Sequence, residues 1–101
     1  GWGFDDCLPF FRKAERNERG ADALHGGDGP LHVSNLRDRN PLSVAFLEAA
    51  QELGLPMNAD FNGPQQEGAG WYQVTVRNGV RCSAATAYLK PALRRPNLRL
   101  E

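Results

Sequence analysis

His25 and His32 are the only imidazoles in the chain, and imidazole is the side chain most often used as a general base near neutral pH. His25 lies in a glycine-rich stretch and His32 in a short segment that alternates apolar and polar residues. Neither has a carboxylate at a recognisable fixed spacing, so a structural role is the favoured interpretation of both. The sequence therefore predicts no catalytic residue.

A metal centre is the second chemistry to consider, because the chain also holds Cys7 and Cys82. Structural zinc sites use close pairs such as C-x-x-C or H-x-x-x-H, and no such pair occurs. Cys82 follows Arg81, which could activate its thiol, but packing is the favoured role for a lone cysteine at the end of a hairpin. We expect no metal, and two separated cysteines indicate reduced thiols in a cytoplasmic setting.

Aromatic residues beside a glycine-rich stretch are the best candidates for a binding surface. Phe61, Trp71 and Tyr72 could line a pocket, and a quaternary ammonium group favours such aromatic faces. Alternatively, Tyr72 belongs to a core face with the valines that follow it, and Trp71 packs against a neighbouring domain.

Asn62 and Gln73 are the polar candidates near the same surface. Hydrogen bonds within a turn or at a strand edge explain these two side chains equally well. The candidate substrate-side residues are therefore Phe61, Asn62, Trp71, Tyr72 and Gln73.

The formal net charge of the chain is +0, which provides no overall attraction to nucleic acid or to an anionic membrane. The segment from Arg77 onward is basic, and a solvated face is its favoured interpretation. With Trp71 and Tyr72 it allows one alternative function, a small α+β module that binds single-stranded nucleic acid. The neutral total charge argues against this alternative, and we expect no nucleic-acid partner.

Three helices are predicted. The first begins at Asp5 or Asp6 and fades from Asn17 to Gly20; its apolar stripe is Cys7, Leu8, Phe10, Phe11 and Ala14. The second has Asn40 as its cap, Pro41 at its first position and Gly54 at its end. Its predicted core face is Leu42, Ala45, Phe46, Ala49, Ala50 and Leu53. Ser83 caps the third, which the Lys90-Pro91 pair should limit.

Strands are predicted at residues 31–34, 71–77 and 80–82, with 98–100 as a further candidate. Asn78-Gly79 is a strong two-residue hairpin turn between the second and third of these. The glycine-rich stretches 20–30 and 56–70 are predicted loops. The pattern indicates an α+β fold with a small, mainly antiparallel sheet and about three helices.

Ordered segments along almost the whole chain carry a family resemblance. They are Gly1-Trp2-Gly3-Phe4-Asp5-Asp6-Cys7-Leu8-Pro9-Phe10-Phe11, Gly29-Pro30-Leu31-His32-Val33-Ser34, Asp60-Phe61-Asn62-Gly63, Gln66-Glu67-Gly68-Ala69-Gly70-Trp71-Tyr72-Gln73, Asn78-Gly79-Val80-Arg81-Cys82-Ser83-Ala84-Ala85, Ala87-Tyr88-Leu89-Lys90-Pro91-Ala92 and Arg95-Pro96-Asn97-Leu98. This set resembles the glucose–methanol–choline (GMC) oxidoreductases. The residues within the segments are most similar to those of the choline and alcohol dehydrogenase branch.

The resemblance implies that residues 1–101 are a single fragment excised from a larger two-domain flavoenzyme. The fragment would belong to the substrate-binding domain, and its C-terminal end would lead back toward the FAD domain. The parent would oxidise a small alcohol by passing hydride to FAD, and this segment would supply scaffold and a substrate-side wall.

The family's flavin and proton-transfer groups have no counterpart in this sequence. The dinucleotide fingerprint G-x-G-x-x-G does not occur, and the catalytic histidine of the family would lie beyond residue 101. We therefore expect the isolated chain to bind no flavin and to be inactive.

The expected partners are the remainder of the parent enzyme and a small alcohol. We also expect self-association through surfaces that the parent would cover. No apolar run is long enough to span a bilayer, and the expected location is cytoplasmic, with peripheral membrane association of the parent left open.

Overall fold

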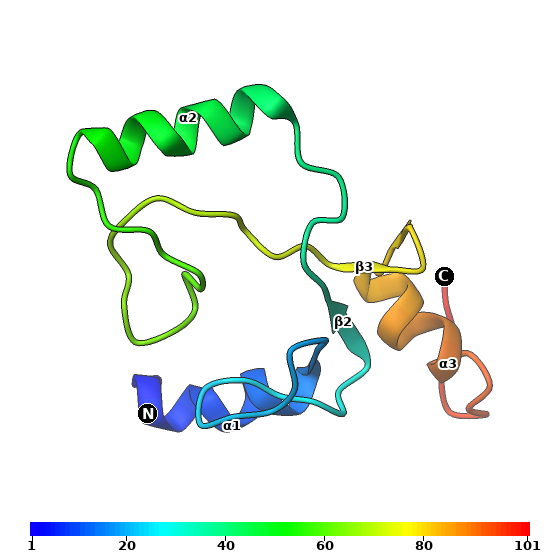
Figure 1. Cartoon of the computed structure of the whole chain (residues 1–101). Coiled ribbons are helices and arrows are strands. Elements are labelled where there is room, and N and C mark those ends of the chain that lie inside the picture. The colour runs from blue at the N-terminus through cyan, green and yellow to red at the C-terminus, as the bar shows by residue number, and fades with distance from the viewer. The chain divides into compact units, whose positions relative to one another are not determined.

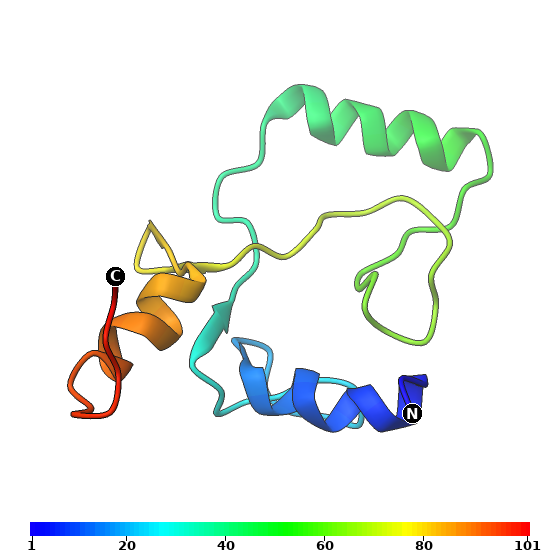
Figure 2. The same cartoon turned by 180° about the vertical axis from the view of Figure 1, so that it is seen from behind.

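The computed structural model describes all residues from 1 to 101, and the chain divides into two compact units (Figure 1). The first, the terminal unit, comprises Gly1–Ser34 and Thr75–Glu101. The second, the inserted unit, is Asn35–Val74 and contains helix α2. Figure 2 shows the same elements from behind.

The terminal unit begins with helix α1, Phe4–Ala14. Gly3 precedes the helix, and its backbone N–H donates to the Asp6 carboxylate at 3.1 Å. The helix thus starts before Asp5, and the predicted start at Asp5 or Asp6 was slightly late. Both carboxylates instead occupy the first turn, where they interact favourably with the positive end of the helix dipole.

Strand β1, Glu15–Asn17, follows α1 directly and pairs in parallel with β2, Leu31–Val33. The loop between them folds back on α1, and Gly26 and Gly29 lie against the backbone of Arg12 and Ala14, where a Cβ would not fit. The predicted loop and β2 are confirmed, but β1 was expected to be a fading helix end. Three polar residues carry no strand signal, so only pairing with β2 defines β1.

The second sheet is an antiparallel hairpin of β3, Val76–Arg77, and β4, Val80–Arg81. Asn78 and Gly79 both have positive φ, 52° and 76°, which confirms the predicted Asn-Gly turn. The predicted strand over 71–77 is regular only at Val76–Arg77. Residues 98–100 form no strand, because nothing pairs with them.

The hairpin leads into a helical segment made of a π-helical turn η1, Ala85–Leu89, and α3, Lys90–Ala92. The Ser83 hydroxyl accepts the backbone N–H of Thr86 at 3.2 Å, in agreement with the predicted cap. The helix continues through Pro91, so the expectation that the Lys90-Pro91 pair would limit it was wrong. The wider turn, in which Lys90 N–H donates to the Ala85 carbonyl, precedes the proline and brings it into the first turn of α3.

In the inserted unit, α2 is Pro41–Glu52. The Asn40 side chain accepts the N–H of Leu42 at 2.9 Å, and Gly54 follows the helix with φ of 83°, so both predicted ends are confirmed. The predicted core face was largely wrong. Leu47 and Ala50 are the buried residues, whereas Phe46 is 71% exposed.

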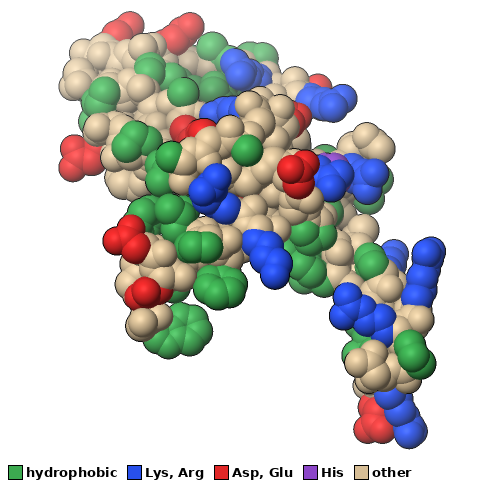
Figure 3. Space-filling model, turned by 90° about the horizontal axis from the view of Figure 1, so that it is seen from below, with side chains coloured by type: hydrophobic (Ala, Val, Ile, Leu, Met, Phe, Trp, Pro, Cys, Tyr) green, Lys and Arg blue, Asp and Glu red, His purple; other side chains and the backbone are tan.

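The helix is apolar on more than one side, which explains that outcome. The face that includes Leu47 and Ala50 packs inside the unit, while Leu42, Phe46 and Leu53 stay exposed. Buried hydrophobic residues are few in the whole chain: Leu47, Ala50, Cys82 and Ala87. Figure 3 shows hydrophobic side chains standing out from the surface of the molecule.

The α+β class is confirmed, with the strands arranged as two small sheets rather than one. One pair is parallel and the other antiparallel. No helix in the structure combines the length and the apolar character needed to cross a membrane.

Candidate functional site

The loop that follows α2 is organised by Asn58, which is only 6% exposed. Its side-chain Nδ2 donates to the carbonyls of Gln65 (2.7 Å) and Glu67 (3.3 Å), and its Oδ1 accepts the N–H of Asp60 at 2.8 Å. Its backbone N–H donates to the Ala69 carbonyl at 2.8 Å. One buried amide therefore closes the loop between residues 58 and 69 and holds Phe61 within it.

Phe61 and Tyr72 stack on each other, with ring centroids 4.7 Å apart and an angle of 28° between the ring planes. Trp71, the neighbour of Tyr72, is half-buried and has the Arg39 guanidinium 5.2 Å above its ring. These contacts fix the orientation of three aromatic rings inside one unit.

The rings border an open cavity of about 480 Å³ within the inserted unit. Its wall includes one side of α2, the glycine-rich end of the loop, and the aromatic residues: Leu36, Ser43, Phe46, Leu47, Ala50, Leu55, Phe61, Gly68, Ala69, Gly70, Trp71 and Tyr72. The wall contains no carboxylate, imidazole or thiol. The cavity can hold an apolar or aromatic group, but it provides no general base.

The structure brings together three of the five candidate residues. Phe61, Trp71 and Tyr72 line the cavity, whereas Asn62 and Gln73 do not. The exposed Asn62 donates its backbone N–H to Asp60 Oδ1 at 2.9 Å, and Gln73 Nε2 donates to Asn35 Oδ1 at 3.3 Å. These are local hydrogen bonds of the kind that the sequence also allowed. Tyr72 is 68% exposed, so it does not belong to a core face.

Arg39 is the residue at this cavity that sequence reasoning missed. It lies about thirty residues before Trp71 in the chain, and no spacing rule connects the two. Its position matters because a cation already covers the face of Trp71. A quaternary ammonium group would meet that positive charge, so the tryptophan face suits a neutral group better than a cation.

His25 forms a structural pair that the sequence analysis did not foresee. The side chain is 5% exposed, and its Nδ1 lies 2.9 Å from Asp22, three residues earlier. Asp22 Oδ1 also accepts the backbone N–H groups of Leu24 (2.8 Å) and His25 (2.7 Å). These two backbone donors, followed by the imidazole, lower the pKa of Asp22. The expectation of no paired carboxylate was wrong, but the pair shapes a loop, in keeping with a structural role.

The two cysteines are free thiols, and Cys82 is buried with its Sγ 3.8 Å from the Pro30 carbonyl oxygen. A packing role therefore describes Cys82 well. No group of three or more His, Cys, Asp or Glu side chains in the chain is arranged to hold a metal ion.

Comparison with known proteins gives a consistent result. The family described as GMC oxidoreductase matches residues 1–101. The chain is 56% identical to mitochondrial choline dehydrogenase of Mus musculus over 101 residues, covering 100% of this chain and 17% of that protein. It is 49% identical over 100 residues to an oxygen-dependent choline dehydrogenase of Sinorhizobium fredii, covering 99% of this chain and 18% of the relative.

A similar fold occurs in the crystal structure of pyridoxine 4-oxidase from Mesorbium loti. It superposes with a TM-score of 0.84 at 37% sequence identity, over 95% of this chain and 19% of that one. The chain thus spans less than a fifth of the length of these relatives. On the match over its full length, the chain belongs to the GMC oxidoreductase family.

Proposed function

We propose that this chain is a segment of an FAD-dependent dehydrogenase that oxidises an alcohol, with choline as the first substrate to test. The observation that carries the proposal is the 56% identity to a choline dehydrogenase along all 101 residues. The Arg39 guanidinium over Trp71 favours a neutral group at that face of the ring, so neutral alcohols are tested beside choline. Flavin would carry the redox chemistry by accepting hydride from the alcohol.

The loop that holds Gly26 and Gly29 is not the proposed site of the flavin pyrophosphate. Gly26 and Gly29 lie against backbone of Arg12 and Ala14, so this glycine cluster packs within the terminal unit and presents no open phosphate-binding turn. FAD binding is therefore proposed for the parent, through residues outside this chain. Within the parent, we assign residues 1–101 to the substrate-binding domain, with the C-terminal end leading toward the FAD domain.

The cavity beside Phe61, Trp71 and Tyr72 is the proposed substrate-side wall. Its apolar lining can exclude water from a small alcohol, and Ser43 offers one hydroxyl as a hydrogen-bond partner. Because no lining group is a base, the wall would orient the substrate while the proton is removed elsewhere. Asn62 and Gln73 would act only indirectly, by fixing the loop and the segment that carry the aromatic residues.

The remainder of the parent is the proposed partner of the exposed apolar surfaces. Phe10 (72% exposed) and Phe11 (70%) on α1, and Phe46 on α2, expose large apolar side chains of the kind that mark contact surfaces. A cytoplasmic location is proposed on the two free thiols, although the mouse relative is named as mitochondrial. The comparisons give no support to a nucleic-acid-binding function.

The activity is tested with the complete protein under anaerobic conditions. Choline, an aliphatic alcohol and an aromatic alcohol are added in turn, and flavin reduction is followed by absorbance. We expect reduction by at least one of them; absence of bound flavin, or no reduction by any alcohol, would contradict the proposal.

The wall is tested separately with Tyr72→Leu in the complete protein. We expect KM for the best alcohol to rise about three- to tenfold with a smaller change in kcat, because the residue positions substrate without taking part in proton transfer. Tyr88→Leu is the matched control, since Tyr88 is also partly exposed but lies in η1. Equal effects of the two substitutions would remove the assignment of the wall and leave the activity itself untouched.

A further inference from the structure

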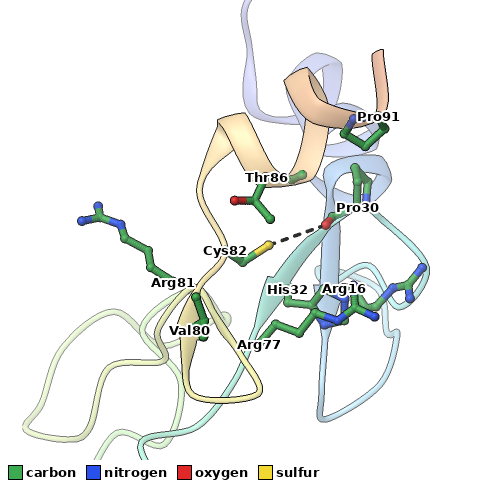
Figure 4. Close-up of a pocket in the computed structure, with 10 residues that line it drawn as sticks. Arg16, Pro30, His32, Arg77, Val80, Arg81, Cys82, Thr86 and Pro91 are labelled. Atoms are coloured by element: carbon green, nitrogen blue, oxygen red, sulfur yellow. Dashed lines mark hydrogen bonds between the residues drawn. The ribbon is translucent and has the colours of Figure 1, made fainter. Parts of the chain in front are cut away.

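Three cationic or titratable side chains from three strands converge in the terminal unit. The parallel register pairs Arg16 of β1 with His32 of β2, so these two side chains lie next to each other on the same face of the sheet. Strand β3 contacts β2 and contributes Arg77. Figure 4 shows Arg16, His32 and Arg77 side by side.

Arg81, one strand further on, does not join this group. In the hairpin register Arg77 faces Val80, while Arg81 faces Val76, so the two arginines lie on opposite faces. Figure 4 shows the Arg81 side chain pointing away from the other three. The hairpin thus offers two arginines in similar sequence surroundings, of which only one reaches the cluster.

The cluster borders a cavity of about 270 Å³. Arg81 also contributes to the wall, although its side chain points away from the other three (Figure 4). The remaining wall is apolar or neutral, with Pro30, Val80, Cys82, Thr86, Ala87 and Pro91. No aspartate or glutamate lines it, and no ion pair joins Arg16, Arg77 or Arg81 to a carboxylate. The positive charge at this cavity is therefore not neutralised within the chain.

Arg16 is held in place by the backbone. Its Nε donates to the Gly29 carbonyl at 3.0 Å and its Nη2 donates to the Asp28 carbonyl at 3.2 Å. A guanidinium has five N–H donors, so the anchored side chain keeps others for a ligand. Partial burial lowers the pKa of His32, and the guanidinium groups of Arg77 and Arg16 lower it further. The positive charge that lowers the pKa of His32 is the same charge that would attract an anion to this cavity.

We propose that Arg16, His32 and Arg77 form a binding site for a tetrahedral phosphate-type dianion. Two guanidinium groups that approach from different strands can each donate to a different oxygen pair of such an anion, and the imidazole N–H can donate to a further oxygen. A single carboxylate has only one plane of oxygens and would leave one arginine without a partner. The site is independent of the proposed function, because neither the cavity nor the three residues belong to the substrate-side wall.

The test is a calorimetric titration of the complete protein with inorganic phosphate at low, constant ionic strength. We expect one saturable phosphate site that Arg77→Gln weakens about tenfold or more, the effect of losing hydrogen bonds to a charged group. Arg81→Gln removes the same charge from the other face of the same hairpin. Because Arg81 lines the cavity but points away from Arg16, His32 and Arg77, we expect it to weaken binding less than about threefold. Equal binding by the Arg77→Gln variant and the unmodified protein would overturn the proposal, as would equal weakening by both substitutions.

Further measurements identify the class of anion that binds and guard against misfolding of the variant. Glycerol phosphate tests a phosphate ester against free phosphate, and acetate tests whether any anion suffices; acetate binding as tightly as phosphate would contradict the site. In the 101-residue chain, phosphate should raise the pKa of His32 in an NMR titration, and no change in the His32 signal on saturation would count against it. If Arg77→Gln does not fold, His32→Gln replaces it, with weaker phosphate binding expected.

Discussion

The protonation of His32 depends on its burial and on two neighbouring arginines. Its pKa in the folded chain is lowered from the ordinary value of 6.5 by partial burial and by Arg77 and Arg16. Between the folded and unfolded pKa values the unfolded chain binds more protons, so the free energy of unfolding increases with pH in that window. The contribution of His32 is fully present above pH 6.5 and is lost as the pH falls toward the folded-state pKa.

The first prediction follows from that sign. Urea unfolding between about pH 5 and pH 8 should show stability falling on the acid side of this window, and His32→Gln should flatten that part of the curve. Added phosphate should also reduce this fall in stability at acid pH, because a bound anion offsets the two guanidinium charges. If His32→Gln keeps the full dependence of stability on pH, that dependence comes from other titratable groups.

Gly70 is required by close backbone approach. A Cβ at this position would collide with the carbonyl oxygen of Asn58, the residue that closes the loop. We predict that Gly70→Ala lowers the free energy of unfolding by roughly 2–4 kcal/mol, because the loop must shift and lose its buried hydrogen bonds.

Gly54→Ala is the control for Gly70. Gly54 also has an unusual backbone, with φ of 83°, but nothing lies near its would-be Cβ. The Gly54→Ala substitution should lower the free energy of unfolding by about 1 kcal/mol, because alanine is strained in the left-handed conformation. Urea unfolding of both variants measures the difference, and equal losses would show that the contact with Asn58 is unimportant.

At the scale of elements, the β3–β4 hairpin depends on its turn. Asn78 has φ of 52° without being glycine, which asparagine tolerates better than most residues. We predict that Asn78→Ala costs about 1–2 kcal/mol of stability, whereas Asn78→Gly changes it by less than about 0.5 kcal/mol. Denaturant unfolding distinguishes the two. A similar cost for both variants would mean that the asparagine side chain, and not the backbone conformation, stabilises the turn.

Both long helices carry apolar side chains that are not buried within the unit to which the helix belongs. Helix α1 has no buried residue, and α2 buries only Leu47 and Ala50. An amphipathic pattern indicates that a helix will have a covered face, but it does not identify the covering element. The predicted stripe on α1 is therefore a real pattern without a buried residue: Phe10 and Phe11 are exposed, and Cys7, Leu8 and Ala14 are half-buried.

For the whole molecule, those faces predict self-association of the isolated chain. Phe10 and Phe11 are adjacent, exposed and on one helix, so a second copy can bury them. Light scattering at increasing concentration should show a rising average mass. Phe10→Ser combined with Phe11→Ser should return it toward the monomer.

Lys13→Ala on the same helix is the control and should leave the association unchanged. A chain that stays monomeric at every concentration would contradict the prediction. The same samples, mixed with FAD, test whether the isolated chain lacks flavin affinity; micromolar binding would place part of the flavin site within these residues.

Local signals in the sequence sufficed for a definite part of this protein. The Asn40 cap and Pro41 start of α2, the Asn78-Gly79 turn and the two glycine-rich loops depend on contacts between residues close in the chain, so they could be recognised before any fold was known. Family membership was also recognisable, because the order of the short segments can be read from the sequence without knowing which of them are in contact.

Tertiary structure alone decided the rest. The parallel pairing of β1 with β2 and the arrival of Arg77 beside His32 join residues far apart in the chain, and such contacts depend on closing long loops rather than on local preference. The same holds for Arg39 above Trp71 and for the choice of Leu47 over Phe46 as the buried residue of α2. Sequence periodicity indicates which residues are able to be buried; the shape of the partner surface determines which of them are.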